Sequence, residues 1–257
     1  MEFVDQLNRT IKLSKTPDRI ISLVPSQTEL LVDLGLRERI VGITKFCVHP
    51  EYLKNEKAIV GGTKQVNIEK IKSLQPNIII CNKEENTKEM VSELEKIAPV
   101  WISDIESVSD SLDFITRMGE VFKVATIASE IISKINCELR HHQEFAIDLD
   151  TKKVLYLIWK GPYMAAGRGT FIDSLLHINN FENVFSQNQV RYPQVEPADF
   201  RKADLILLST EPYPFKKKDV QAFKNEFEKE VKLVDGEYFS WYGSRLIQAF
   251  KYFKTLH

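Results

Sequence analysis

Aromatic and cationic side chains gather in segments that follow short apolar runs of this sequence. The residues of this kind, with the polar residues beside them, are Lys45, Phe46, His49, Lys83 and Glu84 in the first half and Trp159, Lys160, Tyr163, Arg191, Tyr192, Glu237, Trp241, Tyr242 and Arg245 in the second. Aromatic rings bury large flat areas, and Lys and Arg bind carboxylates. The pattern predicts a site for a large, flat, partly anionic ligand. The alternative is that some of these residues fill gaps in the packing or cap loops.

A metal site is a second interpretation of the first-half residues. Cys47 and His49 lie two positions apart, and Glu84 and Glu85 follow a later apolar run. Thiolate, imidazole and carboxylate are all metal ligands, although this spacing matches no closed zinc motif. Direct metal binding and a polar rim around a ligand site both stay open.

The sequence contains no strong catalytic motif. Ser26, Ser209 and Ser244 do not lie in a GxSxG turn, and the segment 61–64 (GGTK) lacks the spacing of a phosphate-binding loop. We therefore expect a protein that binds its ligand without transforming it, with no built-in cofactor and no bound metal of its own.

Composition excludes several classes of protein. The 257 residues carry a formal net charge of −1, so no basic surplus points to nucleic acid or to a membrane surface. No stretch approaches about 20 apolar residues, and the first residues lack a secretion signal. We expect a cytoplasmic monomer that does not insert into membranes. A removed leader would instead place it in the periplasm or at the cell surface.

Two segments repeat the same pattern of a short helix followed by a buried strand. They are residues 67–81 (NIEKIKSLQPNIIIC) and 196–209 (EPADFRKADLILLS). Strands alternating with helices predict α/β lobes with mostly parallel sheets. Ligands of such sheets bind beyond the carboxyl ends of the strands, so two facing lobes predict a cleft. The strands are expected at residues 19–24, 40–44, 58–62, 78–81, 100–103, 154–159, 205–209 and 231–235, after a leading hairpin or arm over residues 1–18.

Residues 108–145 have apolar side chains at helical spacing and contain no proline. They predict one long helix that bridges an N-terminal lobe (residues 1–106) and a C-terminal lobe (residues 148–257), with residues 107–147 as the connection. His141 and His142 are expected on its solvated face. Near the N-terminus, Ser26 and Glu29 have the spacing of a capping box.

Three segments resemble a known family. They are PDRIISLVPSQTELLVDLGLRERIVGIT, VGGTKQVNIEKIKSLQPNIIICN and RYPQVEPADFRKADLILLS. Together with the long middle helix, they resemble the type III, or helical-backbone, substrate-binding proteins of ABC importers, over about residues 17–256. The cobalamin-binding branch looks closest, because the segment 191–195 (RYPQV) matches its aromatic-Pro-Gln-Val segment.

The resemblance implies a ligand held between two lobes. Cobalamin or another corrinoid is expected first, and an iron siderophore or haem next. Tyr192 falls on an aromatic position that sandwiches the corrin ring, and Phe46 falls near a tyrosine. Thr63 replaces a tryptophan, Glu237 falls on a pocket aspartate and Trp241 replaces a pocket arginine.

The resemblance also implies docking on an ABC permease dimer through one glutamate of each lobe. Glu69 matches the first, whereas Ala198 occupies the second position with Glu196 and Asp199 nearby. A cytoplasmic enzyme of similar architecture and an interaction protein that keeps the fold without its pocket are the alternative hypotheses.

Overall fold

The computed structural model describes all 257 residues, which form two compact units. Unit 1 comprises Met1–Ile105, Ser109–Ile135 and Tyr242–Arg245; unit 2 comprises Glu106–Val108, Asn136–Trp241 and Leu246–His257. Each unit contains one largely parallel sheet, which confirms the expected α/β class. The predicted domain boundaries after residues 106 and 147 stay predictions. None of the helices is both long and apolar enough to cross a membrane.

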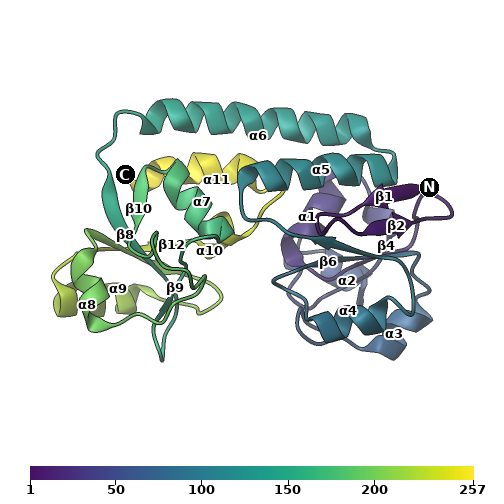
Figure 1. The fold of residues 1–257 in the computed structure, drawn as a ribbon, viewed down its shortest axis with the longest axis horizontal. Helices are drawn as coiled ribbons and strands as arrows, with labels where there is room; N and C mark the ends of the chain where they lie inside the picture. The colour runs from purple at the N-terminus through teal and green to yellow at the C-terminus, as the bar shows by residue number, and fades with distance from the viewer. The chain divides into compact units, whose positions relative to one another are not determined.

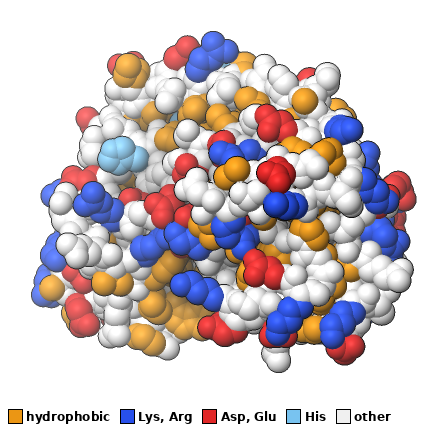
Figure 2. Space-filling view, turned by 45° about the vertical axis from the view of Figure 1, so that its right-hand side comes forward, with side chains coloured by type: hydrophobic (Ala, Val, Ile, Leu, Met, Phe, Trp, Pro, Cys, Tyr) orange, Lys and Arg blue, Asp and Glu red, His pale blue; other side chains and the backbone are white.

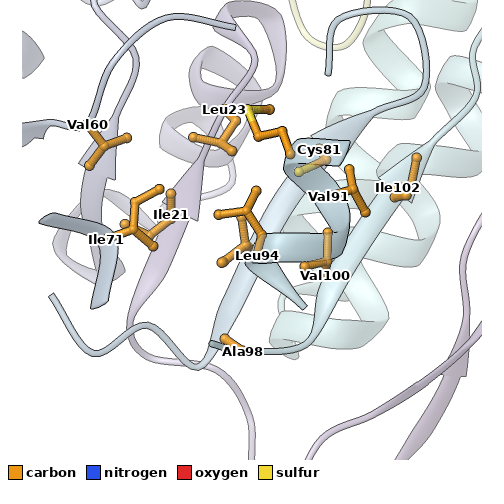
Figure 3. Packing of buried hydrophobic residues seen from close by; sticks show 12 residues of the cluster. Ile21, Leu23, Val60, Ile71, Cys81, Val91, Leu94, Ala98, Val100 and Ile102 are labelled. Atoms are coloured by element: carbon orange, nitrogen blue, oxygen red, sulfur yellow. The ribbon is translucent and has the colours of Figure 1, made fainter. Parts of the chain in front are cut away.

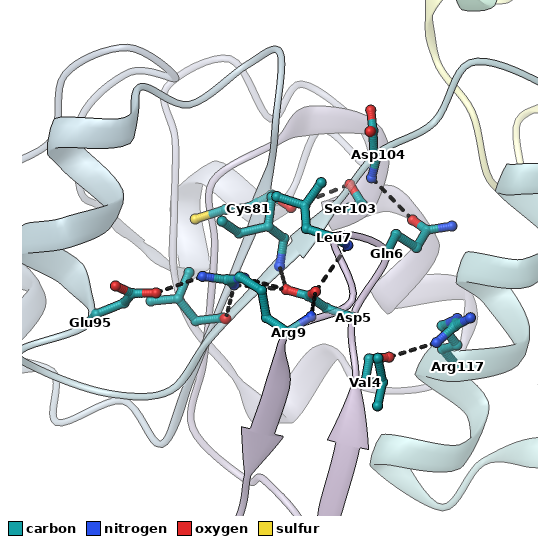
Figure 4. A network of polar contacts seen from close by, with 12 residues as sticks. Val4, Asp5, Gln6, Leu7, Arg9, Cys81, Glu95, Ser103, Asp104 and Arg117 are labelled. Carbon is teal, nitrogen blue, oxygen red and sulfur yellow. Dashed lines mark hydrogen bonds and ion pairs between the residues drawn. The ribbon is translucent and has the colours of Figure 1, made fainter.

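An antiparallel hairpin leads the chain, as predicted. It pairs β1 (Glu2–Val4) with β2 (Thr10–Lys12). Buried Asp5 in its turn accepts hydrogen bonds from the backbone N–H of Leu7 at 3.0 Å and of Arg9 at 2.9 Å. The Arg9 guanidinium binds Asp5, Glu95 and the carbonyl oxygen of Val100 (Figure 4). These contacts fix the hairpin to the edge of the sheet of unit 1.

The sheet of unit 1 has five parallel strands in the order β5-β4-β3-β6-β7. Its elements are β3 (Ile20–Ser22), α1 (Pro25–Asp33), η1 (Arg37–Arg39), β4 (Ile40–Ile43), α2 (Leu53–Glu56), β5 (Ala58–Ile59), α3 (Ile68–Ser73), β6 (Ile78–Asn82), α4 (Lys88–Leu94) and β7 (Val100–Ser103). They are followed by α5 (Val108–Phe122). Side chains alternate along β3 and β6, so Ile21, Leu23 (the residue after β3) and Cys81 lie on the face covered by α3 and α4 (Figure 3). Helices α1 and α5 lie on the opposite side of β6 (Figure 1).

Helix α1 begins one residue before the predicted cap. Its first residue is Pro25, its N-cap is Val24, and no side chain caps it. Pro25 suits this position because its fixed φ fits the first turn and its missing N–H needs no partner. The predicted Ser26–Glu29 capping box is therefore wrong, and the Glu29 carboxylate binds Arg245 instead.

The single long helix predicted over residues 108–145 is wrong: the segment forms two helices, α5 and α6 (Ala125–Ala146). Lys123 takes a left-handed φ of 57°. The N–H of Val124 bonds the Gly119 carbonyl oxygen at 2.8 Å and the N–H of Lys123 bonds that of Glu120 at 3.3 Å. This is the Schellman pattern that ends a helix. A Cβ on Gly119 would lie 2.7 Å from the Ala128 Cβ, so α5 and α6 pack closely at this turn.

The sheet of unit 2 has the order β10-β8-β11-β12, all parallel, with β9 antiparallel on β8. Its elements are β8 (Lys152–Trp159), β9 (Met164–Ala165), α7 (Phe171–Ile178), β10 (Phe181–Asn183), α8 (Pro197–Lys202), β11 (Leu205–Ser209), α9 (Lys217–Phe227), β12 (Glu230–Val234), α10 (Gly236–Ser240), α11 (Leu246–Phe253) and η2 (Lys254–Leu256). Phe200 of α8 and Phe223 of α9 pack on one face, against Leu155 and Ile206. On the other face, Tyr156 contacts Phe239 at 4.9 Å between ring centroids.

His142 is fully buried, so its prediction as a solvated residue is wrong, whereas His141 is exposed. The His142 ring lies 6.0 Å from Phe250 and 5.9 Å from Phe253, measured between centroids. Both phenylalanines belong to α11, which packs on this part of α6. The burial follows from a contact between segments that lie more than 100 residues apart in the sequence.

Candidate functional site

Phe46 and Lys45 form an exposed pair at the carboxyl end of β4. The Phe46 side chain is 48% exposed, and the Lys45 Nζ lies over its ring, 5.1 Å from the centroid. The Lys45 N–H donates to the Gly61 carbonyl oxygen at 2.8 Å. A Cβ on Gly62 would lie 3.1 Å from the Phe46 Cε2, so the absence of a side chain at Gly62 makes room for the ring. The ring is thus held at the surface by the turn and by the glycine loop.

Cys47 turns inward beside this pair. Its Sγ lies 3.1 Å from the Thr28 Oγ1 and 3.3 Å from the Thr44 Oγ1, and burial raises the pKa of the thiol. A buried thiol with a raised pKa is a poor metal ligand and nucleophile. No group of three or more His, Cys, Asp and Glu side chains is placed to hold a metal ion. His49 is half-buried after this turn.

Lys83 and Glu84 follow β6. The Lys83 Nζ forms an ion pair with Asp104, which follows β7, at 2.6 Å. The Glu84 N–H donates to the Asn82 Oδ1 at 2.8 Å, and the Lys64 ammonium donates to the Glu84 carbonyl oxygen. These contacts order the loop and neutralise the charge of Lys83.

Tyr242 and Arg245 belong to unit 1, although they come from the end of the chain. The Gln27 amide donates to the Tyr242 Oη at 2.9 Å, and burial raises the pKa of this phenol. Arg245 makes two hydrogen bonds of 2.8 Å to Glu29. Burial raises the pKa of Glu29 although Arg245 acts against it. The polar groups of both predicted ligand contacts thus bind other residues of unit 1.

Trp159, Lys160 and Tyr163 lie at and after the carboxyl end of β8. Trp159 is 42% exposed and contacts Tyr213 edge-on, with 5.8 Å between centroids. Lys160 forms an ion pair with Asp219 of α9 at 2.7 Å. Because this contact favours both charged forms, it raises the pKa of Lys160 and lowers that of Asp219. Tyr163 packs on two phenylalanines of the core, so Trp159 is the exposed aromatic of this edge.

Arg191 and Tyr192 precede α8. The Arg191 Nη1 lies 3.1 Å from a carboxylate oxygen of Glu106, and its carbonyl oxygen accepts the Gly167 N–H at 2.8 Å. The Tyr192 side chain is 37% exposed. A Cβ on Gly167 would lie 2.9 Å from the Val190 carbonyl oxygen, so this segment packs on the loop after β9.

Trp241 and Glu237 lie near Glu211, a half-buried carboxylate that was not among the predicted site residues. The Trp241 Nε1 donates to Glu211 at 3.1 Å, and the Ser240 hydroxyl donates to the same oxygen. Burial raises the pKa of Glu211, and the nearby charge of Glu237 raises it further. The available signal was its place two positions after the end of the central strand β11, in the loop at the carboxyl end of that strand.

The three predicted docking acids differ in how exposed their side chains are. Glu69, in the first turn of α3, is 82% exposed and pairs with Lys72 at 2.8 Å. Glu196 is the exposed N-cap of α8. Asp199 is buried: it accepts the Glu196 N–H at 3.0 Å and pairs with Lys202. Glu69 and Glu196 are thus exposed at the starts of the two helices that the sequence repeats.

One face of the molecule mixes charges of both signs (Figure 2). Figure 2 shows lysines and arginines alternating with aspartates and glutamates on one face, with hydrophobic patches between them. This agrees with the formal net charge of −1.

Comparison with known proteins adds a family match. The sequence model of the family described as "Periplasmic binding protein" matches residues 20–233. An uncharacterized ABC transporter substrate-binding lipoprotein of Bacillus subtilis is 26% identical over 187 residues, which are 70% of this chain and 59% of that protein. A vitamin B12-binding protein of Yersinia pestis is 25% identical over 206 residues, which are 76% of this chain and 71% of that protein.

The fold also matches solved structures. A periplasmic heme binding protein of Pseudomonas aeruginosa superposes with a TM-score of 0.81 at 18% identity, covering 93% of this chain and 92% of that one. At this identity the likeness establishes the fold alone.

Proposed function

Because this chain belongs to the periplasmic binding protein family, we propose that it binds a metal chelate or tetrapyrrole-like ligand without transforming it. A corrinoid such as cobalamin comes first, and an iron siderophore or haem next, because the relatives include vitamin B12-binding and heme-binding proteins. The loops at the carboxyl ends of the strands would contact this ligand.

One observation carries the proposal: each unit exposes an aromatic ring beside a lysine at the carboxyl end of a strand. Phe46 stands next to Lys45 after β4, and Trp159 stands next to Lys160 at the end of β8. Large aromatic rings are usually buried, and a flat ligand that stacks on these exposed rings would bury them. Tyr192, also partly exposed, would add a third ring.

The polar residues of the site have a supporting role in this proposal. Lys83, Lys160, Arg191 and Arg245 each pair with an acid of the protein. Their N–H groups would hold ligand oxygens in fixed positions, since ion-paired side chains have lost part of their freedom. The other ligand contacts predicted from residue type remain proposals; they are His49, Glu84, Tyr163, Glu237, Trp241 and Tyr242.

Titration of the purified protein with cobalamin, hemin and a ferric siderophore, followed by absorbance, tests the proposal. Wild-type protein is expected to saturate with at least one of them. Phe46→Ala and Trp159→Ala should each weaken binding by about 5-fold to 150-fold, because a stacked ring contributes about 1–3 kcal/mol by burial. Phe145→Ala, which removes another partly exposed ring, is the control. No saturation with any of the three ligands would refute the proposal.

We further propose delivery of the ligand to an ABC permease dimer, with Glu69 and Glu196 as docking acids, and a location outside the cytoplasm. The descriptions of the family as periplasmic and of one relative as a lipoprotein support the location over the cytoplasm. Cell fractionation tests the location. Pull-down of the permease by wild-type protein and by the double variant Glu69→Ala/Glu196→Ala tests the docking. Size-exclusion chromatography should find a monomer.

A further inference from the structure

We propose that Lys45 selects ligands that carry an anionic oxygen, carboxylate or phosphate, at the edge of the flat ring. The inference rests on the proposed function and names a specificity-determining residue of that site. It follows from how the five cations assigned to the ligand are partnered in the structure.

Four of the five cations are neutralised by acids of the protein. Their pairs are Lys83–Asp104 at 2.6 Å, Lys160–Asp219 at 2.7 Å, Arg191–Glu106 at 3.1 Å and Arg245–Glu29 at 2.8 Å. An acidic ligand group would have to compete with the carboxylate already present at each of them. Lys45 differs from these four cations. Its side chain is exposed, and its ammonium contacts the Phe46 ring and forms no ion pair with a carboxylate.

The Lys45 ammonium lies where a flat ligand would stack on Phe46, so stacking of the ligand changes the contacts of this charge. The Lys45 Nζ lies over the face of Phe46, and Gly62 lies against the Cε2 edge of the ring. A flat ligand seated on the covered face displaces the ammonium toward the rim of the ligand. There the amine keeps a favourable contact only if the ligand offers it an acceptor, and an anionic oxygen is the strongest one. A ligand without such a group loses the cation–π contact and gains nothing in return.

Matched ligand pairs test the inference. Cobalamin and cobinamide share the corrin ring, but cobinamide lacks the phosphate. Hemin and its dimethyl ester share the porphyrin, but the ester lacks the carboxylates. Wild-type protein is expected to bind the anionic member of at least one pair about threefold to fivefold more tightly, the upper part of the range for an exposed ion pair. Cobinamide also lacks the ribose and the base, so the phosphate or the carboxylate is identified as the recognised group only where the difference within the pair disappears in Lys45→Gln.

Lys45→Gln and Lys96→Gln are the matched variants. In Lys45→Gln the two members of the pair should bind within about twofold of each other. Lys96→Gln removes an exposed lysine outside the proposed site, which pairs with Glu93 at 2.6 Å, and should keep the wild-type ratio. The wild-type ratio should also shrink between 50 and 500 mM salt, roughly the range over which the Debye length falls from 14 to 4 Å.

The outcomes separate this inference from the proposed function. A wild-type ratio that survives in Lys45→Gln, or equal binding of both members by wild type, overturns the role of Lys45 and leaves the binding function standing. Failure of all four compounds and of the ferric siderophore to bind wild-type protein overturns both.

Discussion

Glu29 and Arg245 form a two-point ion pair although 216 positions separate them in the chain. The Nε and Nη2 of Arg245 each lie 2.8 Å from one carboxylate oxygen of Glu29. Their side chains are only 10% (Arg245) and 18% (Glu29) exposed. The Gly243 N–H also donates to the Ser111 hydroxyl at 2.9 Å. These contacts fix the segment Tyr242–Arg245 within unit 1.

Arg245→Ala should lower the free energy of unfolding by about 2–4 kcal/mol, because it leaves a largely buried carboxylate without its partner. Urea denaturation measures the loss. Glu29→Gln in the same protein should recover part of it, since a neutral amide needs no counter-charge. The control is Arg37→Ala, which breaks the more exposed pair with Glu56 and should cost less than about 1 kcal/mol. Equal losses in the two arginine variants would contradict the prediction.

Gly119→Ala should destabilise the protein by about 1–3 kcal/mol, although alanine is the better helix former. The reason is the 2.7 Å between a Cβ at this position and the Ala128 Cβ, which leaves no room for a methyl group. Thermal unfolding measures the change. Adding Ala128→Gly should restore the stability lost in Gly119→Ala, except for the cost of about 1 kcal/mol of placing a glycine within helix α6. A gain in stability on Gly119→Ala would mean that α5 and α6 do not pack at this turn.

Gly62→Ala should weaken ligand binding about threefold while changing the free energy of unfolding by less than about 1 kcal/mol. The added methyl would lie 3.1 Å from the Phe46 Cε2 and so would shift the exposed ring. Titration with the ligand that wild type binds gives the affinity. In the Phe46→Ala background the same substitution should have no effect, because the group that it displaces is gone. An equal effect in both backgrounds would show that Gly62 acts without Phe46.

Buried strands were predictable because, in an α/β chain, a short apolar run bounded by polar residues is typical of a strand that is covered on both faces. The predicted runs 100–103 and 205–209 coincide with β7 and β11. The two-residue β9 (Met-Ala) and the three-residue β10 (Phe-Glu-Asn) were not predicted, because neither contains the β-branched residues that marked the other strands. The repeated helix-to-strand pattern likewise predicted α3 with β6 and α8 with β11.

What escaped prediction depends on contacts that are distant in sequence or on an unusual backbone. Helix ends in a left-handed residue are usually marked by glycine, but here Lys123 adopts that conformation, so the break between α5 and α6 had no signal. The partners of the site cations were equally hidden, since Asp219 lies 59 positions after Lys160. Aromatic and cationic residue types identified a candidate site, whereas their pairing needed the fold.

His142 should make the protein lose stability in mild acid. Burial, with the charges of His257 and Lys254, lowers its pKa from 6.5 to about 4. The unfolded chain therefore binds a proton that the folded chain resists, so the contribution is intact above pH 6.5 and is lost as the pH falls toward 4. The loss amounts to about 3 kcal/mol over this range. Urea denaturation between pH 7.5 and 4 should give a shallower pH slope for His142→Leu, while His141→Gln, at the exposed neighbour, keeps the wild-type slope. Equal slopes for wild type and His142→Leu would mean that His142 is protonated inside unit 2.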